Sequence, residues 1–192
     1  KDVPFIRIAS AAGAKVVVQL RGSEFRDMYY RMGAWRQKRL RHELSKASAA
    51  VVLGENLRYI FEGFFPEDCI YSVPNGGDFS FPERQNKALR VTYLANCLPG
   101  KGLRELLGAM DILAGEKDLP HFEFRAFGSW DNASYQAECE AIAGRPNMKH
   151  CRLMGPVSGN EKWQALADSD IFVFAPKSPE GHPWSLIEAA AT

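Results

Sequence analysis

Residues 90–113 read RVTYLANCLPGKGLRELLGAMDIL, and this stretch is the strongest sequence indication of the fold. Residues 90–95 have the length and composition of a buried strand, and residues 103–113 repeat apolar side chains at the helical period. Pro99 and Gly100 mark the turn between them. A strand followed at once by a helix is typical of a parallel sheet with helical connections.

The same alternation continues to the end of the chain. Further strands are predicted at 122–127, 151–154 and 171–175, and further helices at 133–143, 161–167 and 184–191. Short strands that are apolar on both sides predict an α/β fold in which helices cover both faces of a parallel sheet.

The first part of the chain has a less regular pattern. A buried strand is predicted at 16–20, and further strands at 49–53 and 70–73. Helical stretches are predicted from the turn at 21–23 to about residue 46, and over 55–65. Because residues 79–88 are polar and carry little apolar pattern, we expect domains at 1–80 and 90–192, joined by a linker at 81–89.

Composition excludes several protein classes. The 192 residues are 46% hydrophobic and 24% charged, which is ordinary globular composition and not that of a disordered or fibrous chain. No apolar run approaches the ~18 residues of a membrane-spanning helix, and no secretion signal opens the sequence. The four cysteines form no CxxC pair, and neither they nor the four histidines have zinc-finger spacing. We therefore expect a soluble, cytoplasmic protein with reduced thiols and no structural metal.

Charge is unevenly distributed along the chain. Residues 1–50 contain eleven Lys/Arg and four Asp/Glu, whereas the remainder contains thirteen and nineteen. The basic excess is concentrated in residues 21–46, which suggests an anionic partner such as a phosphate, a nucleic acid or an acidic lipid surface. A basic helix face exposed to solvent explains the same pattern.

Candidate binding residues follow the predicted strands of the second domain, because parallel sheets bind ligands outside the carboxyl ends of their strands. The loops concerned are 96–102, 128–132, 155–160 and 176–183. Lys101, beside a helix N-terminus, is well placed to hold a diphosphate, although an ordinary surface lysine is the alternative. The glycines around it match neither the dinucleotide fingerprint nor the Walker pattern.

Two carboxylates at the end of the chain form the second candidate feature. Glu180 is expected in the crevice at a strand end and Glu188 in the first turn of the last helix. Paired carboxylates can hold sugar hydroxyls through charge-assisted hydrogen bonds. The alternative is that Ser185 and Glu188 form a capping box, which would explain Glu188 without any ligand.

Five motifs occur in an order that resembles the family 4 retaining glycosyltransferases, which have the GT-B fold. They are LRGSEF at 20–25, VPNGGD at 73–78, VTYLANCLPGKG at 91–102, GPV at 155–157 and EGHPWSLIEA at 180–189. The resemblance covers essentially the whole chain. It implies two Rossmann-like domains with a cleft between them, the first for the acceptor and the second for a nucleotide-diphosphate sugar.

The resemblance also implies roles for individual residues. Lys101 would neutralise the donor diphosphate, Glu180 would contact the donor sugar, and Glu188 would accept hydrogen bonds from the ribose. Glu180 and Arg21 are the expected catalytic residues. The expected donor-binding residues are Lys101, Asn96, Gly155, Val157, Glu180, Gly181, Ser185 and Glu188, with Gly155 and Val157 lining the base pocket.

Three positions depart from the family pattern. Asn96 stands where an arginine is usual, Arg21 where a histidine is often found, and Pro183 where a glycine is customary. Phosphate charge would then be met mainly by Lys101, with Arg21 as a second candidate cation. Pro183 removes one backbone N–H that could have bound phosphate.

The resemblance predicts metal-independent transfer of a sugar, with retention of configuration, to a glycan or lipid-linked acceptor. The basic segment suggests peripheral contact with the inner face of a membrane; no nucleic acid is expected. The first domain looks incomplete and the second truncated, so we expect this polypeptide to show little or no turnover. A Rossmann-type oxidoreductase and a non-catalytic module that binds through residues 21–46 are the alternatives.

Overall fold

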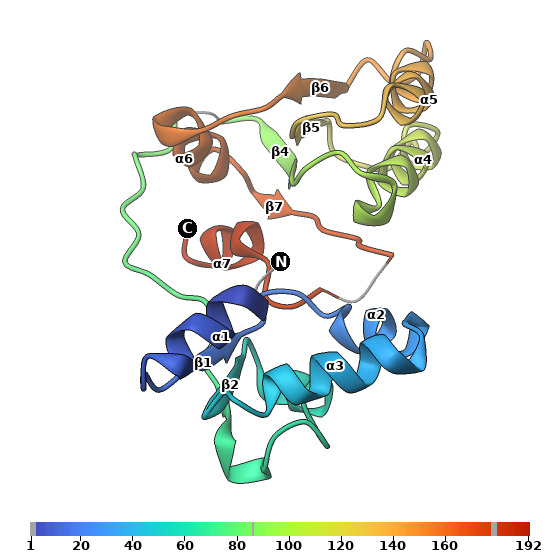
Figure 1. The fold of residues 1–192 in the computed structure, drawn as a ribbon. Helices are drawn as coiled ribbons and strands as arrows, with labels where there is room; N and C mark the ends of the chain where they lie inside the picture. Colours follow the sequence, from blue (N-terminus) through green and yellow to red (C-terminus); the bar gives the residue numbers. More distant parts are fainter. Residues whose placement is uncertain (1–2, 86, 178–179) are drawn as a thin grey trace. The chain divides into compact units, whose positions relative to one another are not determined.

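The computed structural model describes residues 3–85, 87–177 and 180–192, which form two compact units (Figure 1). Unit 1 comprises Lys1–Gly76 with Glu180–Pro183, and unit 2 comprises Gly77–Pro179 with Trp184–Thr192. Each unit contains its own parallel sheet and its own hydrophobic core. The α/β fold class predicted from the sequence is therefore present in both units.

Unit 1 is built on a three-stranded parallel sheet in the order β1-β2-β3. Its strands are β1 (Val17–Gln19), β2 (Ala49–Val52) and β3 (Ile70–Ser72). Its helices are α1 (Val3–Ala11), α2 (Phe25–Arg31) and α3 (Ala34–Leu44), with the 3₁₀ helices η1 (Glu55–Ile60) and η2 (Glu67–Cys69). The core packs β2 and β3 against side chains of α1, α3 and η1.

The structure corrects several predictions for unit 1. The strand at 16–20 was expected to be buried, but β1 is an edge strand and Val17 is 57% exposed. The single helix expected up to about residue 46 is two helices, because Met32 and Gly33 adopt extended backbone conformations between them. The segment 55–65 contains a 3₁₀ helix that ends at Ile60, and α1 was not predicted at all.

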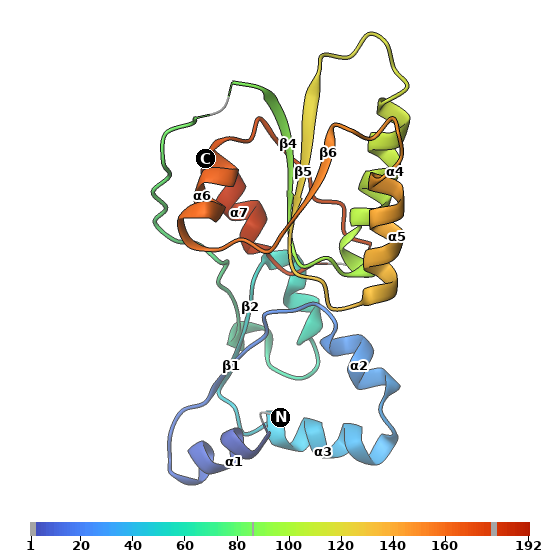
Figure 2. The ribbon, with the colours of Figure 1, turned by 90° about the horizontal axis from the view of Figure 1, so that it is seen from above.

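Unit 2 contains a four-stranded parallel sheet in the order β6-β5-β4-β7. The strands are β4 (Leu89–Leu94), β5 (Phe122–Phe127), β6 (Cys151–Gly155) and β7 (Ile171–Phe172). The 3₁₀ helix η3 (Pro99–Lys101) leads into α4 (Leu103–Leu113). Helix α4 and α5 (Ala133–Ala143) cover one face, whereas α6 (Gly159–Ala167) and α7 (Trp184–Ala190) cover the other (Figure 2).

The two faces of this sheet bury different apolar clusters. Tyr93 and Phe124 pack with α4 and α5, while Leu94 and Phe127 pack with Leu166 of α6. Neighbouring residues of one strand thus face opposite layers, which explains why the strands are apolar on both sides. The predicted arrangement of helices on both faces is confirmed.

The predicted helices at 103–113 and 133–143 have the observed boundaries. Asn132 is the N-cap of α5, where its side-chain Oδ1 accepts a hydrogen bond from the backbone N–H of Tyr135 at 2.9 Å. The strand predicted at 171–175 is much shorter. β7 ends at Phe172. The N–H of Val173 still donates to the Thr92 carbonyl of β4 at 2.9 Å, but the N–H of Lys177 bonds to the loop at Gly100.

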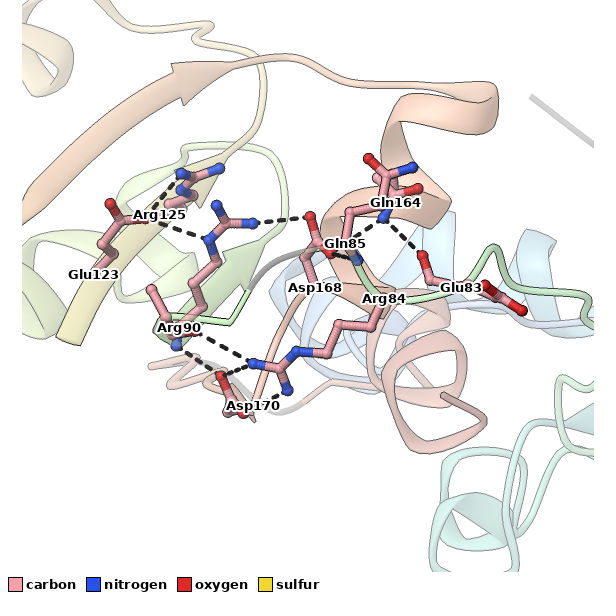
Figure 3. Close-up of polar contacts among 10 residues, drawn as sticks. Glu83, Arg84, Gln85, Arg90, Glu123, Arg125, Gln164, Asp168 and Asp170 are labelled. Carbon is pink, nitrogen blue, oxygen red and sulfur yellow. Dashed lines mark hydrogen bonds and ion pairs between the residues drawn. The ribbon is translucent and has the colours of Figure 1, made fainter.

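A polar cluster at the amino ends of the unit 2 strands holds the segment that precedes β4 (Figure 3). Arg90 bonds to Asp168 at 2.9 Å through its guanidinium and to Asp170 at 2.8 Å through its backbone N–H. Arg84 pairs with Asp170 at 2.6 Å, and the Gln85 N–H donates to Asp168 at 2.8 Å.

These bonds attach the segment expected as a linker, 81–89, to unit 2, and its last residue already belongs to β4. Phe81 adds an apolar contact with the cluster around Leu166. Within the expected linker, Asn86 lies outside the described residues.

A buried carboxylate joins the helices of unit 1. Glu43 of α3 is fully buried and accepts hydrogen bonds from Arg7 of α1 and, at 2.8 Å, from Lys46. The hydrogen bonds from Arg7 and then Lys46, which outweigh the effect of burial, lower the pKa of Glu43 to about 2.

We predict that Glu43→Gln removes part of the acid sensitivity of unit 1. A carboxylate whose folded-state pKa is depressed stabilises the fold above its unfolded pKa, and loses that contribution as the pH falls through the folded value. Denaturant unfolding should show the variant less stable than wild type at pH 7, with the gap narrowing between about pH 4.5 and pH 2. A gap that stays constant over this range would contradict the assignment.

Candidate functional site

The strand order of unit 2 creates one position where two strand-end loops diverge. From β4 the chain moves outward through β5 to β6, and it then returns to the other side of β4 as β7. In open parallel sheets, ligands bind at such a point, outside the carboxyl ends of the strands. The loops after β4 (95–102) and after β7 (173–177) flank it here.

These two loops are in direct backbone contact. Gly102 has a left-handed conformation with φ +78°, and a Cβ at this position would lie 1.8 Å from the carbonyl oxygen of Ala175. The N–H of Lys177 donates to the carbonyl of Gly100 at 2.9 Å. Only glycine fits the conformation and the space at position 102.

Lys101 and Asn96 lie in the loop after β4, as the sequence predicted. The Lys101 ammonium is 5.9 Å from the ring centroid of Phe174, in the loop after β7, so this side chain reaches across the point where the two loops diverge. Asn96 is exposed, and its Oδ1 accepts a hydrogen bond from the Ser129 hydroxyl at 3.2 Å.

The first turn of α4 already has internal partners. The backbone N–H of Arg104 donates to the Tyr135 hydroxyl at 3.0 Å, and the pKa of that hydroxyl is raised to about 12, mainly by burial. Glu105 pairs with Lys177 at 2.5 Å. Burial opposes the shift, but hydrogen bonds led by that from Lys177 keep the pKa of Glu105 below its ordinary value. The predicted anion-binding role therefore falls on the Lys101 side chain more than on this helix end.

Gly155 and Val157 lie where β6 ends, on the same edge of the sheet. The Gly155 carbonyl accepts a hydrogen bond from the N–H of Gly128 at 2.9 Å, which joins the loops after β5 and β6. A Cβ at Gly155 would meet nothing within 4 Å, so the backbone there borders open space. Val157 is half-buried against the cluster around Leu166.

The structure corrects the predicted position of Glu188. Helix α7 begins at Trp184, so Glu188 lies in its second turn and Ser185 lies inside the helix, where it cannot act as the N-cap of a capping box. Glu188 is buried and pairs with Lys162 of α6 at 2.7 Å. The buried Glu188 carboxylate thus has a partner within the protein.

Glu180 and Gly181 belong to unit 1, whereas the sequence analysis placed Glu180 at a strand end of the second domain. A Cβ at Gly181 would lie 3.1 Å from the carbonyl oxygen of Arg21 and 3.3 Å from Leu53. The segment 180–183 therefore packs on residues that directly follow β1 and β2. Ser178 and Pro179, also in the predicted loop, lie outside the described residues.

Sequence reasoning missed a pair of residues that fixes this segment. The backbone N–H of Asn75 donates to Nδ1 of His182 at 3.1 Å, and the Asn75 side chain donates to the His182 carbonyl at 2.8 Å. Asn75 and His182 each lie in one of the five sequence motifs. Their contact depends on tertiary structure, and no local signal in the sequence indicates it.

The described residues offer no cluster suited to a metal ion, since no three or more of their His, Cys, Asp or Glu side chains are arranged to hold one. Among the residues that the structure describes, no helix is long and apolar enough to span a membrane. The four cysteines are free, and burial raises the pKa of both Cys97 and Cys151 to about 12.

Residues 78–192 match the family described as Glycosyl transferases group 1. The comparison with curated proteins gave no match.

Solved structures share the fold at low identity. The structure of Anabaena HepE in complex with UDP and glucose aligns with a TM-score of 0.73 and 14% identity, over 97% of this chain and 54% of HepE. The pneumococcal O-GlcNAc transferase GtfA, with UDP and GlcNAc, gives 0.69 and 17%, over 96% and 37%. A variant of S. aureus TarM, with UDP, Fondaparinux and alpha-GlcNAc-glycerol, gives 0.69 and 17%, over 92% and 35%.

The chain thus spans between about a third and just over half of the length of these proteins. The predicted GT-B-like α/β fold class is confirmed by this structural similarity.

We predict that Gly102→Ala destabilises unit 2, whereas Gly108→Ala does not. The left-handed backbone alone costs an alanine about 1–2 kcal/mol, and the contact with Ala175 adds to this. Gly108 lies inside α4, where a Cβ would meet no atom within 4 Å, so alanine there should stabilise the helix by about 0.5–1 kcal/mol. Denaturant unfolding of both variants measures the difference; equal effects would exclude the close backbone contact.

Proposed function

The chain belongs to the Glycosyl transferases group 1 family, and on that premise we propose that it transfers a sugar from a nucleotide-diphosphate sugar to a glycan or lipid-linked acceptor, with retention of configuration. Within this proposal, the second predicted domain, 90–192, binds the donor and the first, 1–80, serves the acceptor. The related structures that contain UDP together with glucose or GlcNAc support a nucleotide sugar as the donor. The TarM variant with bound Fondaparinux supports a glycan as the acceptor.

The observation that carries the donor proposal is the position of Lys101. Its ammonium lies over Phe174 at the point where the loops after β4 and β7 diverge, which is where parallel sheets of this kind bind ligands. A ring face attracts an ammonium electrostatically, so this contact helps to hold the Lys101 side chain at that point. Such a cation suits a diphosphate.

The proposed reaction breaks the bond between the anomeric carbon of the donor sugar and the diphosphate oxygen. A bond forms from the acceptor hydroxyl oxygen to that carbon, the diphosphate oxygen takes the electron pair of the broken bond, and the hydroxyl proton passes to the departing nucleoside diphosphate. Negative charge grows on the diphosphate as the bond breaks, and a preorganised cation there accelerates the step. We assign this role to Lys101, and therefore propose transfer without a divalent metal.

The other roles are proposals of the same kind. Glu180 contacts the donor sugar and Arg21 acts as a second catalytic residue. Asn96, Gly155, Val157, Gly181, Ser185 and Glu188 complete the donor-binding set. For Glu188, binding the ribose requires that the carboxylate share or exchange its present partner, Lys162.

A second proposal concerns a basic and aromatic face on α2 and α3 of unit 1. Trp35 is 69% exposed with the Arg39 guanidinium 5.4 Å from its ring centroid, and Tyr30 is 61% exposed. Arg36 and Lys38 lie on the same exposed part of α3, and among the described residues they have no acidic partner. Aromatic rings with flanking cations suit the headgroup region of an anionic membrane, so we infer peripheral contact at the cytoplasmic face.

We predict that one of UDP-glucose, GDP-mannose or ADP-glucose raises the unfolding temperature, and that Lys101→Ala weakens this ligand's binding roughly tenfold to hundredfold. The estimate follows from the ~1.5–3 kcal/mol of a hydrogen bond to a charged group. A ligand at 100 times its dissociation constant adds ~2.7 kcal/mol of stability. Thermal shift and calorimetry make the measurement, with exposed Lys149→Ala of unit 2 as the control.

No shift with any nucleotide sugar, or equal binding by the Lys101 and Lys149 variants, would overturn the donor assignment. NAD(H) in the same panel tests the oxidoreductase alternative, because only that alternative expects it to bind in preference to nucleotide sugars. Chelation by EDTA should leave donor binding unchanged if the lysine replaces a metal.

We predict that the chain sediments with vesicles containing phosphatidylserine, and that added salt reduces the binding. Replacing Arg36, Lys38 and Arg39 together by alanine should abolish it, since each cation contributes ~1 kcal/mol near an anionic surface. Replacing the exposed cations Lys117, Lys149 and Arg152 of unit 2 removes the same charge and should have little effect. Equal losses in both triple variants, or salt-insensitive binding, would contradict a specific face.

A further inference from the structure

The carboxyl ends of all three unit 1 strands meet at one edge, because the sheet is parallel throughout. Arg21, Leu53 and Asn75 each follow one of these strands. Segment 180–183 contacts all three: Gly181 lies against Arg21 and Leu53, and His182 is bonded to Asn75. It therefore crosses the whole edge of a sheet from which it is more than 100 residues distant in sequence.

The two bonds between Asn75 and His182 differ in chemistry. The backbone N–H of Asn75 donates to Nδ1 of the imidazole at 3.1 Å, and the Asn75 side-chain Nδ2 donates to the His182 carbonyl at 2.8 Å. One bond therefore holds the ring and the other holds the main chain. A ring nitrogen that accepts a hydrogen bond carries no proton, so a neutral His182 must bear its proton on Nε2.

The geometry points to Asn75 and His182 as positioning residues that fix Glu180 through this segment. Glu180 is separated from His182 by one residue, Gly181, whose Cβ side lies against the Arg21 carbonyl and the Leu53 side chain. A main chain held at Gly181 and His182 leaves Glu180 little freedom. The consequence for donor recognition rests on the proposed function, in which Glu180 contacts the sugar.

The pairing assigns a specificity role to two residues that need not touch the substrate. If the segment were held only by its connections to β7 and α7, loss of the Asn75 contacts would not affect Glu180. With the two-bond attachment, losing either bond loosens the segment, and the affinity gained from the sugar falls while affinity for the nucleoside diphosphate stays. Loss of one net hydrogen bond corresponds to roughly threefold to tenfold.

Four variants separate these effects. His182→Phe removes the ring acceptor and His182→Asn restores an acceptor oxygen, whereas Asn75→Ala removes the side-chain donor and keeps the backbone N–H. Glu180→Gln leaves both bonds intact and serves as the matched control. Amide hydrogen exchange over 180–182 and the affinity ratio of nucleotide sugar to nucleoside diphosphate are measured for each, using the best nucleotide sugar of the thermal-shift panel.

We expect faster exchange over 180–182 in His182→Phe and Asn75→Ala, with β2 protection unchanged, and recovery in His182→Asn. The affinity ratio should fall in the first two variants and in Glu180→Gln, while exchange in Glu180→Gln stays at the wild-type rate. The effects of His182→Phe and Asn75→Ala should be non-additive when combined.

Unchanged exchange in both disrupting variants would overturn the inference. So would ¹⁵N spectra of wild-type His182 that place the proton of the neutral ring on Nδ1, a test that needs no variant to fold. If the wild type bound no nucleotide sugar, the proposed function would fail, but the exchange data would still decide the attachment of the segment. If the wild type bound a nucleotide sugar but His182→Phe left the affinity ratio unaltered, the positioning role would be rejected while the attachment of the segment would stand.

Discussion

The close approach of Gly102 to the Ala175 carbonyl is the contact on which the candidate site of unit 2 depends. Because β7 pairs with β4 through only two residues, the ladder alone aligns their following loops weakly. The contact at Gly102 and the bond from Lys177 to Gly100 continue the association beyond the sheet. Lys101 stands between these two attachments, so its backbone is fixed on both sides.

The last motif of the chain serves both units. Its first part, Glu180–Pro183, packs with unit 1, and its second part, Trp184–Thr192, packs with unit 2. The two carboxylates therefore have different surroundings: Glu180 is held near the strand ends of the first sheet, and Glu188 is paired with Lys162 on a helix layer of the second. Their spacing of eight residues does not make them one paired site within either unit.

Sequence patterns predicted unit 2 well because its elements are determined locally. Apolar runs bounded by clear turns predicted the limits of α4 and α5, and the rule that parallel strands end at one edge predicted that Asn96, Lys101 and Gly155 lie at the carboxyl ends of β4 and β6. Unit 1 was predicted less well. Within residues 21–46, Gly33 is the one residue that signals the extended backbone at Met32 and Gly33, which divides the helix.

Residues whose placement depends on distant partners could not be predicted. The assignment of Glu180 to unit 1 follows from the contacts of Gly181 and His182, and a sequence window contains none of these partners. The capping-box interpretation of Glu188 failed for a related reason. The motif fits the first turn of a helix, but α7 begins one residue before Ser185, and the carboxylate is paired with Lys162 instead.

The basic residues among the first fifty include two groups with different consequences. Arg7 and Lys46 bond to the buried Glu43, and Arg41 donates to the Gly63 carbonyl at 2.5 Å, so these cations stabilise unit 1 itself. The cations around Trp35 have exposed positions and lie beside an aromatic ring that is itself largely exposed. Composition counts both groups alike, yet the first group could meet an external anion only by giving up bonds that hold unit 1, whereas the exposed cations of α3 could meet one with the fold intact.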